Sequence, residues 1–150
     1  MELHSYDVRD PAQLITQIAE RVDLAEDTAW LALVHRPSTT QKVLDVRPLE
    51  VPALLDDDED ITEVLRDAAQ SFGLGWRRRY EHAIVTVVVR PGRCVLGPNE
   101  LVWFRGWRYA NHMEAVFDGD LVLVTEHGWL DFMTNEAGFV PAMQPAALGG

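Results

Sequence analysis

Residues 83–89 read Ala-Ile-Val-Thr-Val-Val-Val, and no other segment restricts the fold of this chain as strongly. Successive side chains of a β-strand point to opposite faces of the sheet, so a strand that is apolar on both faces needs cover on both. The run stops at Pro91-Gly92, because proline cannot continue the hydrogen bonding of a central strand. The sequence therefore predicts a central strand in a sheet that has a packed layer on each side.

Three segments have the apolar spacing of amphipathic helices. Asp10-Pro11 combines a capping carboxylate with a proline that suits the first helical turn. Asp60 is followed three residues later by Glu63, as in a capping box. The predicted helices cover residues 11–22, the residues from 60 up to Gly73, and residues 98–113.

Two pairs of extended runs are separated by turn residues, which predicts two β-hairpins. The resulting order is helix, hairpin, helix, central strand, helix, hairpin. This order predicts a single α/β domain with one mixed sheet and helices on both faces. The predicted hairpin strands are 28–35 with 42–47, and 121–125 with 129–132. We divide the chain into an N-terminal helix and lead-in (1–27), the α/β domain (28–133) and a poorly ordered tail (134–150).

The formal charge of −11 is divided unevenly along the chain. Residues 1–67 hold 16 acidic and 6 basic residues, whereas residues 68–150 hold 8 and 7. All seven bases of the second part are arginines between 77 and 108. The net acidity argues against nucleic-acid binding, which relies on a surplus of Lys and Arg. The acidic first half instead suits a basic protein partner.

We expect a cytoplasmic protein without a membrane partner. No charged-then-apolar leader opens the chain, and no apolar run approaches the roughly 18 residues of a membrane helix. Cys94 is the only cysteine, which excludes an internal disulfide and a cysteine-cluster metal site.

The common catalytic signatures are missing. The chain has no Gly-x4-Gly-Lys phosphate loop, no Gly-x-Gly-x-x-Gly, and no serine on a strand-to-helix elbow. No two of its five histidines have the i+2, i+3 or i+4 spacing that aims two ligands at one metal. We therefore assign no catalytic residue, no metal ligand and no cofactor.

Three features have two interpretations each. Cys94 follows the central strand near Arg90 and Arg93, whose charges would lower the pKa of its thiol, or it is a small loop residue without chemistry. The acidic run 56–60 either holds a hard cation or is a solvated loop. The predicted helix 98–113 has an aromatic face, which either packs on the sheet or meets a partner, and a basic face opposite. The candidate interface residues on these two faces are Trp103, Trp107, Arg105 and Arg108.

The stretch 83–132 contains VVVRPGRCVLGPNELVWFRGWRYANHM and then DGDLVLVTEHGWLDF. In element order and pattern it resembles the second half of a JAB/MPN domain, the zinc-dependent isopeptidase fold, and its bacterial RadC-like branch in particular. The resemblance covers roughly residues 28–133 and implies the layering shared with cytidine deaminases. In that family the central strand ends in His-x-His-Pro and the next helix opens with Ser-x-x-Asp. The two histidines and the aspartate hold zinc, and an acid near the first strand is the general base.

Carried over onto this chain, the zinc motif is lost. The first ligand histidine falls on Val88 and the second on Arg90, while the proline is retained as Pro91. The Ser-x-x-Asp positions read Gly-Pro-Asn-Glu, so only the acid survives, as Glu100. The first strand, 28–35, carries no acid. The resemblance therefore implies the fold and argues against the activity, because a guanidinium among the ligands repels a metal.

Inactive members of this fold typically act as scaffolds, so the resemblance predicts a non-catalytic domain that binds a protein partner or, as a homodimer, its own copy. Arg90, Arg93 and Glu100 define a vestigial cleft at the end of the central strand. Arg90 either binds a small anion or a partner's acidic side chain there, or pairs with Glu100 and closes the site.

Two other functions stay open. One is a divergent metal-dependent hydrolase or isopeptidase with a rearranged site of His82, Glu100 and His112. The other is an acidic inhibitor that mimics nucleic acid and occupies a DNA-binding partner, which requires a regular surface array of carboxylates.

Overall fold

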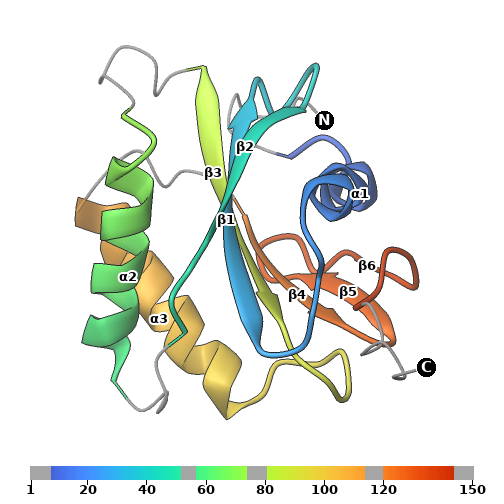
Figure 1. The fold of residues 1–150 in the computed structure, drawn as a ribbon. Helices are drawn as coiled ribbons and strands as arrows, with labels where there is room; N and C mark the ends of the chain where they lie inside the picture. Colours follow the sequence, from blue (N-terminus) through green and yellow to red (C-terminus); the bar gives the residue numbers. More distant parts are fainter. Residues whose placement is uncertain (1–7, 52–56, 74–80, 114–119, 144–150) are drawn as a thin grey trace.

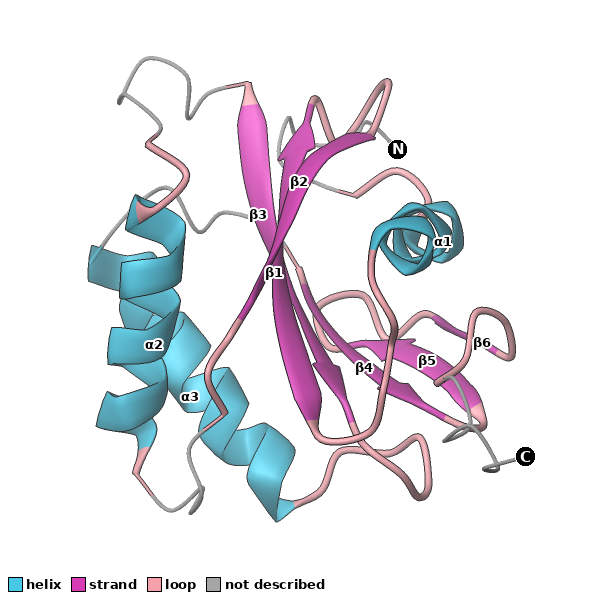
Figure 2. Cartoon of the chain, in the orientation of Figure 1, coloured by secondary structure: helices cyan, strands magenta, loops and turns pink. Residues whose placement is uncertain are grey.

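The apolar run 83–89 forms most of β3 (His82–Val89), the third strand in a six-stranded sheet of order β2-β1-β3-β4-β5-β6. Every residue of β3 is buried. The computed structural model describes residues 8–51, 57–73, 81–113 and 120–143, and it has helices on both sides of the sheet (Figure 1, Figure 2). The prediction of a mixed α/β sheet with helices on both faces is confirmed.

β3 pairs antiparallel with β1 and parallel with β4, and α3 makes the crossover that a parallel pair requires. The other neighbouring strands are antiparallel. Within the described ranges no helix is long and apolar enough to cross a membrane. The helices are α1 (Pro11–Arg21), α2 (Asp58–Gln70) and α3 (Pro98–Met113). The other strands are β1 (Thr28–His35), β2 (Lys42–Pro48), β4 (Leu121–Thr125), β5 (Gly128–Asp131) and β6 (Ala137–Gly138).

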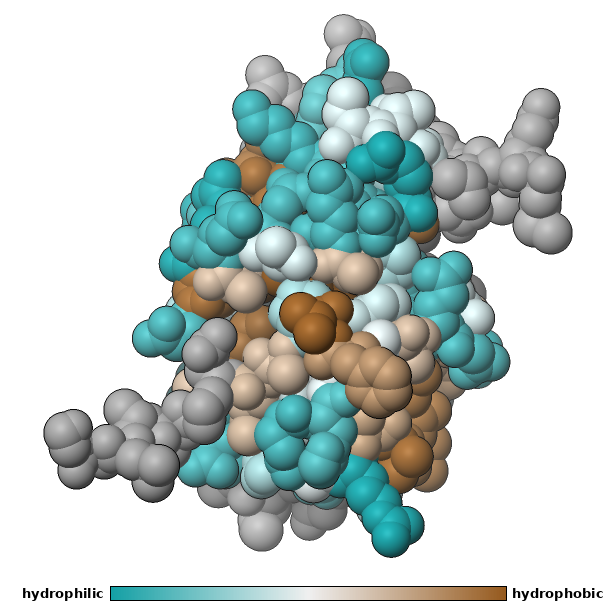
Figure 3. All heavy atoms as spheres, turned by 90° about the vertical axis from the view of Figure 1, so that its right-hand side faces the viewer, coloured by the Kyte–Doolittle hydropathy of each residue, from teal (hydrophilic) through white to brown (hydrophobic). Residues whose placement is uncertain are grey.

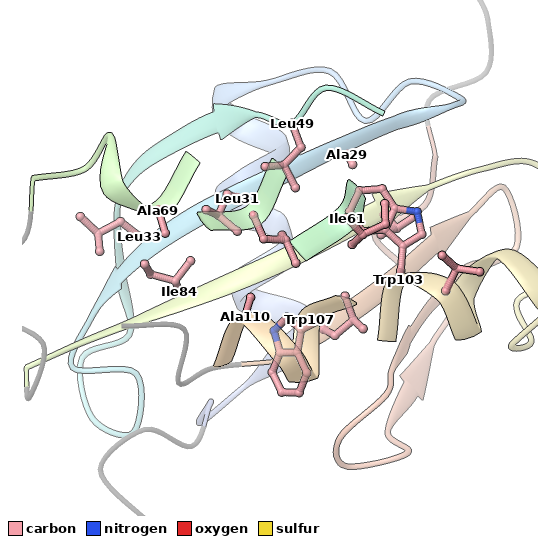
Figure 4. Close-up of a cluster of buried hydrophobic side chains, with 14 residues drawn as sticks. Ala29, Leu31, Leu33, Leu49, Ile61, Ala69, Ile84, Trp103, Trp107 and Ala110 are labelled. Atoms are coloured by element: carbon pink, nitrogen blue, oxygen red, sulfur yellow. The ribbon is translucent and has the colours of Figure 1, made fainter. Parts of the chain in front are cut away.

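One face of the sheet is covered by α2 and α3. Leu31 of β1 and Ile84 of β3 point to this side and join a cluster with both tryptophans of α3, Trp103 and Trp107. Figure 4 shows Trp103 beside Ile61 of α2. The two helices and the sheet therefore share one core, and α3 is held by the side chains that the sequence places on its aromatic face.

The opposite face is covered in part by α1, which buries Leu14, Ile15 and Ile18 against it. Figure 3 views this side of the molecule, where apolar side chains gather below a hydrophilic upper part. Phe139 and Val140, just after β6, are the most exposed large apolar side chains among the described residues, at 88% and 77%.

The start of α2 differs from the prediction. The helix begins at Asp58 rather than at Asp60, and its cap is Asp57, whose carboxylate accepts a hydrogen bond from the Glu59 N–H at 2.9 Å. The earlier start places consecutive acidic residues in the first turn, where the helix dipole favours negative charge. The capping-box prediction at Asp60 is therefore wrong. Asp56, the first residue of the acidic run, lies outside the described residues.

β6 extends the sheet past residue 133, which the sequence predicts as the end of the domain. It pairs with β5, and the Trp129 indole donates to the Val140 carbonyl at 3.1 Å. A strand of two residues has no apolar period, so the sequence offers no pattern that predicts it. Residues 144–150 of the predicted tail lie outside the described residues.

Candidate functional site

Arg90, the first residue after β3, forms a forked ion pair with Glu100 in the first turn of α3. Its Nε lies 2.9 Å from one carboxylate oxygen of Glu100, and its Nη2 lies 2.6 Å from the other. The Glu100 side chain is 1% exposed and that of Arg90 is 22% exposed. Bidentate pairs of this kind are stronger than single ion contacts. The hydrogen bond to Glu100 is the main cause that raises the pKa of Arg90 above its ordinary value.

The remaining donors of Arg90 bind the loop that follows. Nη1 donates to the carbonyls of Pro91 and Arg93 at 3.0 and 3.1 Å, and Nη2 donates to the Val95 carbonyl at 2.6 Å. Together with the two bonds to Glu100, these contacts give each of the five guanidinium N–H groups an acceptor. No donor is left for an anion. The geometry thus supports the interpretation in which Arg90 pairs with Glu100 and closes the cleft, and it speaks against an anion site on Arg90.

Two further contacts hold the loop between β3 and α3. The Gly97 N–H donates to Glu100 at 2.7 Å, which caps α3. The Gly92 N–H donates to both carboxylate oxygens of Glu126 at 3.1 and 3.0 Å. Hydrogen bonds from the Glu126 backbone and from Gly92 lower the pKa of the Glu126 carboxyl. Gly92 has φ +107°, a conformation that glycine adopts without strain. The loop is therefore tied to β3, to α3 and to the turn after β4.

A cavity of about 220 Å³ opens beside the ion pair. We call it the β3-end cavity. Its apolar walls include Val51, Val88 and Trp103, and its polar lining includes Asp27 and Asn99 beside the ion pair itself. These residues come from the start of β1, the segment after β2, the end of β3 and the start of α3. The cavity therefore exists only because four segments that are distant in the sequence meet at this end of the sheet.

The two other residues predicted near Arg90 stay outside the ion pair. The side chain of Arg93 is exposed, and its contact with Arg90 is through the backbone carbonyl. Cys94 is half-buried, and burial raises the pKa of its thiol above the ordinary value. The charge of Arg90 acts in the opposite direction but is outweighed, and Glu100 adds to the rise. The predicted lowering of the Cys94 pKa by neighbouring arginines is therefore wrong, because burial of the thiol outweighs the charge of Arg90.

We expect Cys94 to react slowly with iodoacetamide. The thiolate is the nucleophile, and a raised pKa moves its formation to higher pH, so near neutral pH the native rate should be at least about threefold below that of the urea-unfolded chain. The native rate should climb with pH through a midpoint above the ordinary thiol value of 9.0. The unfolded chain is the control, because it exposes the same thiol. A native rate equal to or above the unfolded rate would contradict the direction of the pKa shift.

Two of the candidate interface residues on α3 belong to the core. Trp103 is 1% exposed and Trp107 is 3% exposed, because both face the sheet and α2. The aromatic face of α3 therefore packs on the sheet, and the prediction of an exposed tryptophan interface on this helix is wrong. Trp103 meets open space only as a wall of the β3-end cavity. Arg105 and Arg108 are exposed, and the Arg108 guanidinium lies 5.8 Å from the centre of the Phe104 ring. The outer face of α3 is therefore basic, as predicted, without the tryptophans.

The rearranged metal site is not assembled. His82 is the first residue of β3, and Glu100 pairs with Arg90 beyond the last one. Each strand residue adds roughly 3.3 Å, so the length of the whole strand separates His82 from Glu100. His82 instead lies against His35, with ring centroids 5.0 Å apart. The side chain of His112 lies outside the described residues. In the described parts of the chain, no three His, Cys, Asp or Glu side chains are placed to share a metal ion.

Sequence reasoning did not identify Asp27 or Val51 as part of this site. Asp27 has φ +58°, a left-handed conformation that Asp and Asn adopt more readily than other side chains. Neither residue belongs to a motif, and their link to Arg90 depends on strand pairing. The register of β1 and β3, which places Thr28 opposite Val89, brings Asp27 to the cavity. The pairing of β2 with β1, which places Pro48 opposite Trp30, brings Val51 there.

No protein-family model, no curated protein and no solved structure matches this chain significantly.

Proposed function

We propose that this chain is a non-catalytic domain of the JAB/MPN type, which binds a protein partner through the end of the sheet where β3 stops. The element order and the parallel β3–β4 pair around α3 are compatible with that family. In the resemblance the ligand positions fall on Val88, Arg90 and Glu100. These three residues line the same cavity, which supports the correspondence.

The closed ion pair is the observation that carries the proposal. Where the resembling enzymes hold zinc, this chain has a guanidinium whose five donors all have acceptors and a carboxylate that is buried against it. A fixed positive charge at a ligand position repels a metal, and a carboxylate with a permanent partner is a poor base. The arrangement favours a rigid surface element rather than a reaction centre.

The electrostatics of this end of the molecule favour a basic partner. β1 starts here, β2 ends here and α2 starts here, at the lower end of Figure 1. The described residues of these segments expose six acidic side chains, against the single exposed base Arg93 in the loop after β3. Such a surface attracts a basic partner and speeds its association. The acidic side chains are Glu26, Asp27, Glu50, Asp57, Glu59 and Asp60.

A cavity-blocking variant tests the proposal. Asn99 is exposed at the mouth of the β3-end cavity, so Asn99→Trp should cover the cavity without disturbing the core. Gln70→Trp, at the exposed end of α2, adds the same side chain elsewhere on a helix. Bait protein is incubated with lysate of the native host, and bound proteins are quantified by mass spectrometry. We expect a partner that wild type and Gln70→Trp retain equally and that Asn99→Trp loses at least about tenfold, the loss typical of a blocked interface centre.

Two results would overturn the proposal. One is a partner that all three proteins retain equally, because the binding surface would then lie elsewhere. The other is one equivalent of zinc in protein purified without an affinity tag, which would restore the metal-dependent hydrolase as the better explanation.

A further inference from the structure

We infer that the β3-end cavity receives one lysine or arginine side chain of the partner, with Asp27 as its counter-ion. This inference rests on the proposed function and names the group that the binding end recognises. It starts from the size of the cavity. At about 220 Å³ the cavity is smaller than the roughly 300–1,000 Å³ of pockets that hold small-molecule ligands. It is large enough for a single long side chain.

The walls suit the stem of such a side chain. Val51, Val88 and Trp103 line the interior with apolar surface, against which the methylene groups of lysine or arginine pack well. Val88 is 6% exposed and Trp103 is 1% exposed, so both are held in place by the core rather than by the ligand. A preformed wall of this kind loses little conformational entropy on binding.

The charges at the mouth select a cation. Arg90 and Glu100 also line the cavity, but they neutralise each other, and Arg90 has no donor left for an anion. Asp27 is exposed, and its side chain makes no hydrogen bond or ion pair within the described residues. The net charge of the lining is therefore that of one free carboxylate. The other exposed acids at this end of the molecule add to the same negative potential. A cationic side chain is therefore bound more favourably there than an anionic or a neutral one.

Backbone NMR titrations with small probes test the inference. The probes are the N-acetyl methylamides of lysine and arginine, and the N-acetyl methylamide of norleucine supplies the same stem without the charge. We expect the cationic probes to give saturable shifts at the amides of Thr28, Val51 and Asn99 and at the Trp103 indole, with millimolar affinity. Norleucine should bind at least about threefold more weakly, since it lacks the charged contact.

Asp27→Asn removes the counter-ion and keeps a side chain that accepts the left-handed backbone conformation. The substitution should lower the affinity for the lysine probe about threefold to tenfold at low salt, the range for a charged contact at a partly enclosed site. Glu20→Gln on the exposed face of α1 makes the same change in net charge and should leave the affinity unchanged.

The inference is overturned if Asp27→Asn and Glu20→Gln bind the lysine probe equally. It is also overturned if the shifts are confined to residues 57–60, or if no probe shifts the cavity residues. In each of these cases the proposed function still stands when Asn99→Trp loses the captured partner, so the two failures can be told apart.

Discussion

Arg90→Ala is expected to lower the free energy of unfolding by about 3–5 kcal/mol, the usual cost of removing one partner from a buried ion pair. The Glu100 carboxylate is 1% exposed and would lose both of its bonds to the guanidinium. It would keep only the Gly97 N–H, which cannot balance a buried charge. Three loop carbonyls would lose their donor as well. Urea unfolding followed by tryptophan fluorescence measures the change.

Two variants show whether the buried charge is the cause. Arg93→Ala removes an exposed arginine from the same loop and should change stability by no more than about 0.5 kcal/mol. Glu100→Gln combined with Arg90→Ala removes the unpaired charge but keeps an oxygen for Gly97, so the double variant should be more stable than Arg90→Ala alone. An Arg90→Ala protein as stable as wild type would show that the pair does not hold this end of the sheet.

Trp103→Ala is expected to lower the free energy of unfolding by about 3–5 kcal/mol, as large-to-small substitutions of buried aromatic residues do. Trp103 is 1% exposed and lies in the core between α2, α3 and the sheet. The substitution removes its contacts there and leaves a void that neighbouring side chains fill only in part. Thermal and urea unfolding measure the loss.

Tyr109→Ala is the matched control on the same helix, because Tyr109 is 58% exposed. It should alter stability by no more than about 0.5 kcal/mol. If Trp103 were an exposed surface residue with no packing role, Trp103→Ala would fold with wild-type stability. That outcome would contradict its place in the core.

The helices and strands were predictable because local patterns decide them. The bounds predicted for β1, α3 and β4 agree with the structure, since each has an uninterrupted apolar period and a clear start or stop. The start of α2 was less predictable, because Asp57 and Asp60 are both good caps and the sequence does not rank them. β6 is held by pairing and by the Trp129 indole, neither of which has a local pattern.

The candidate site was predictable only in its list of residues. Arg90 and Glu100 were identified together, but the choice between an open anion site and a closed pair depended on where the carbonyls of the loop point. The two tryptophans show the same limit. Their helical spacing predicts a shared face, yet a shared face is compatible with a core and with an interface until the sheet is in place.

The sequence by itself determined the class of the fold, because an apolar strand with cover on both sides and three amphipathic helices leave few arrangements. It also determined that net acidity lies in the first half of the chain. Only the tertiary structure decided that Arg90 is neutralised and that Asp27, which no motif marks, lines the cavity without a charged partner among the described residues. The physical reason is that hydrogen-bond satisfaction and cavity walls depend on contacts between segments far apart in the chain, here the starts of β1 and α3 and the end of β3.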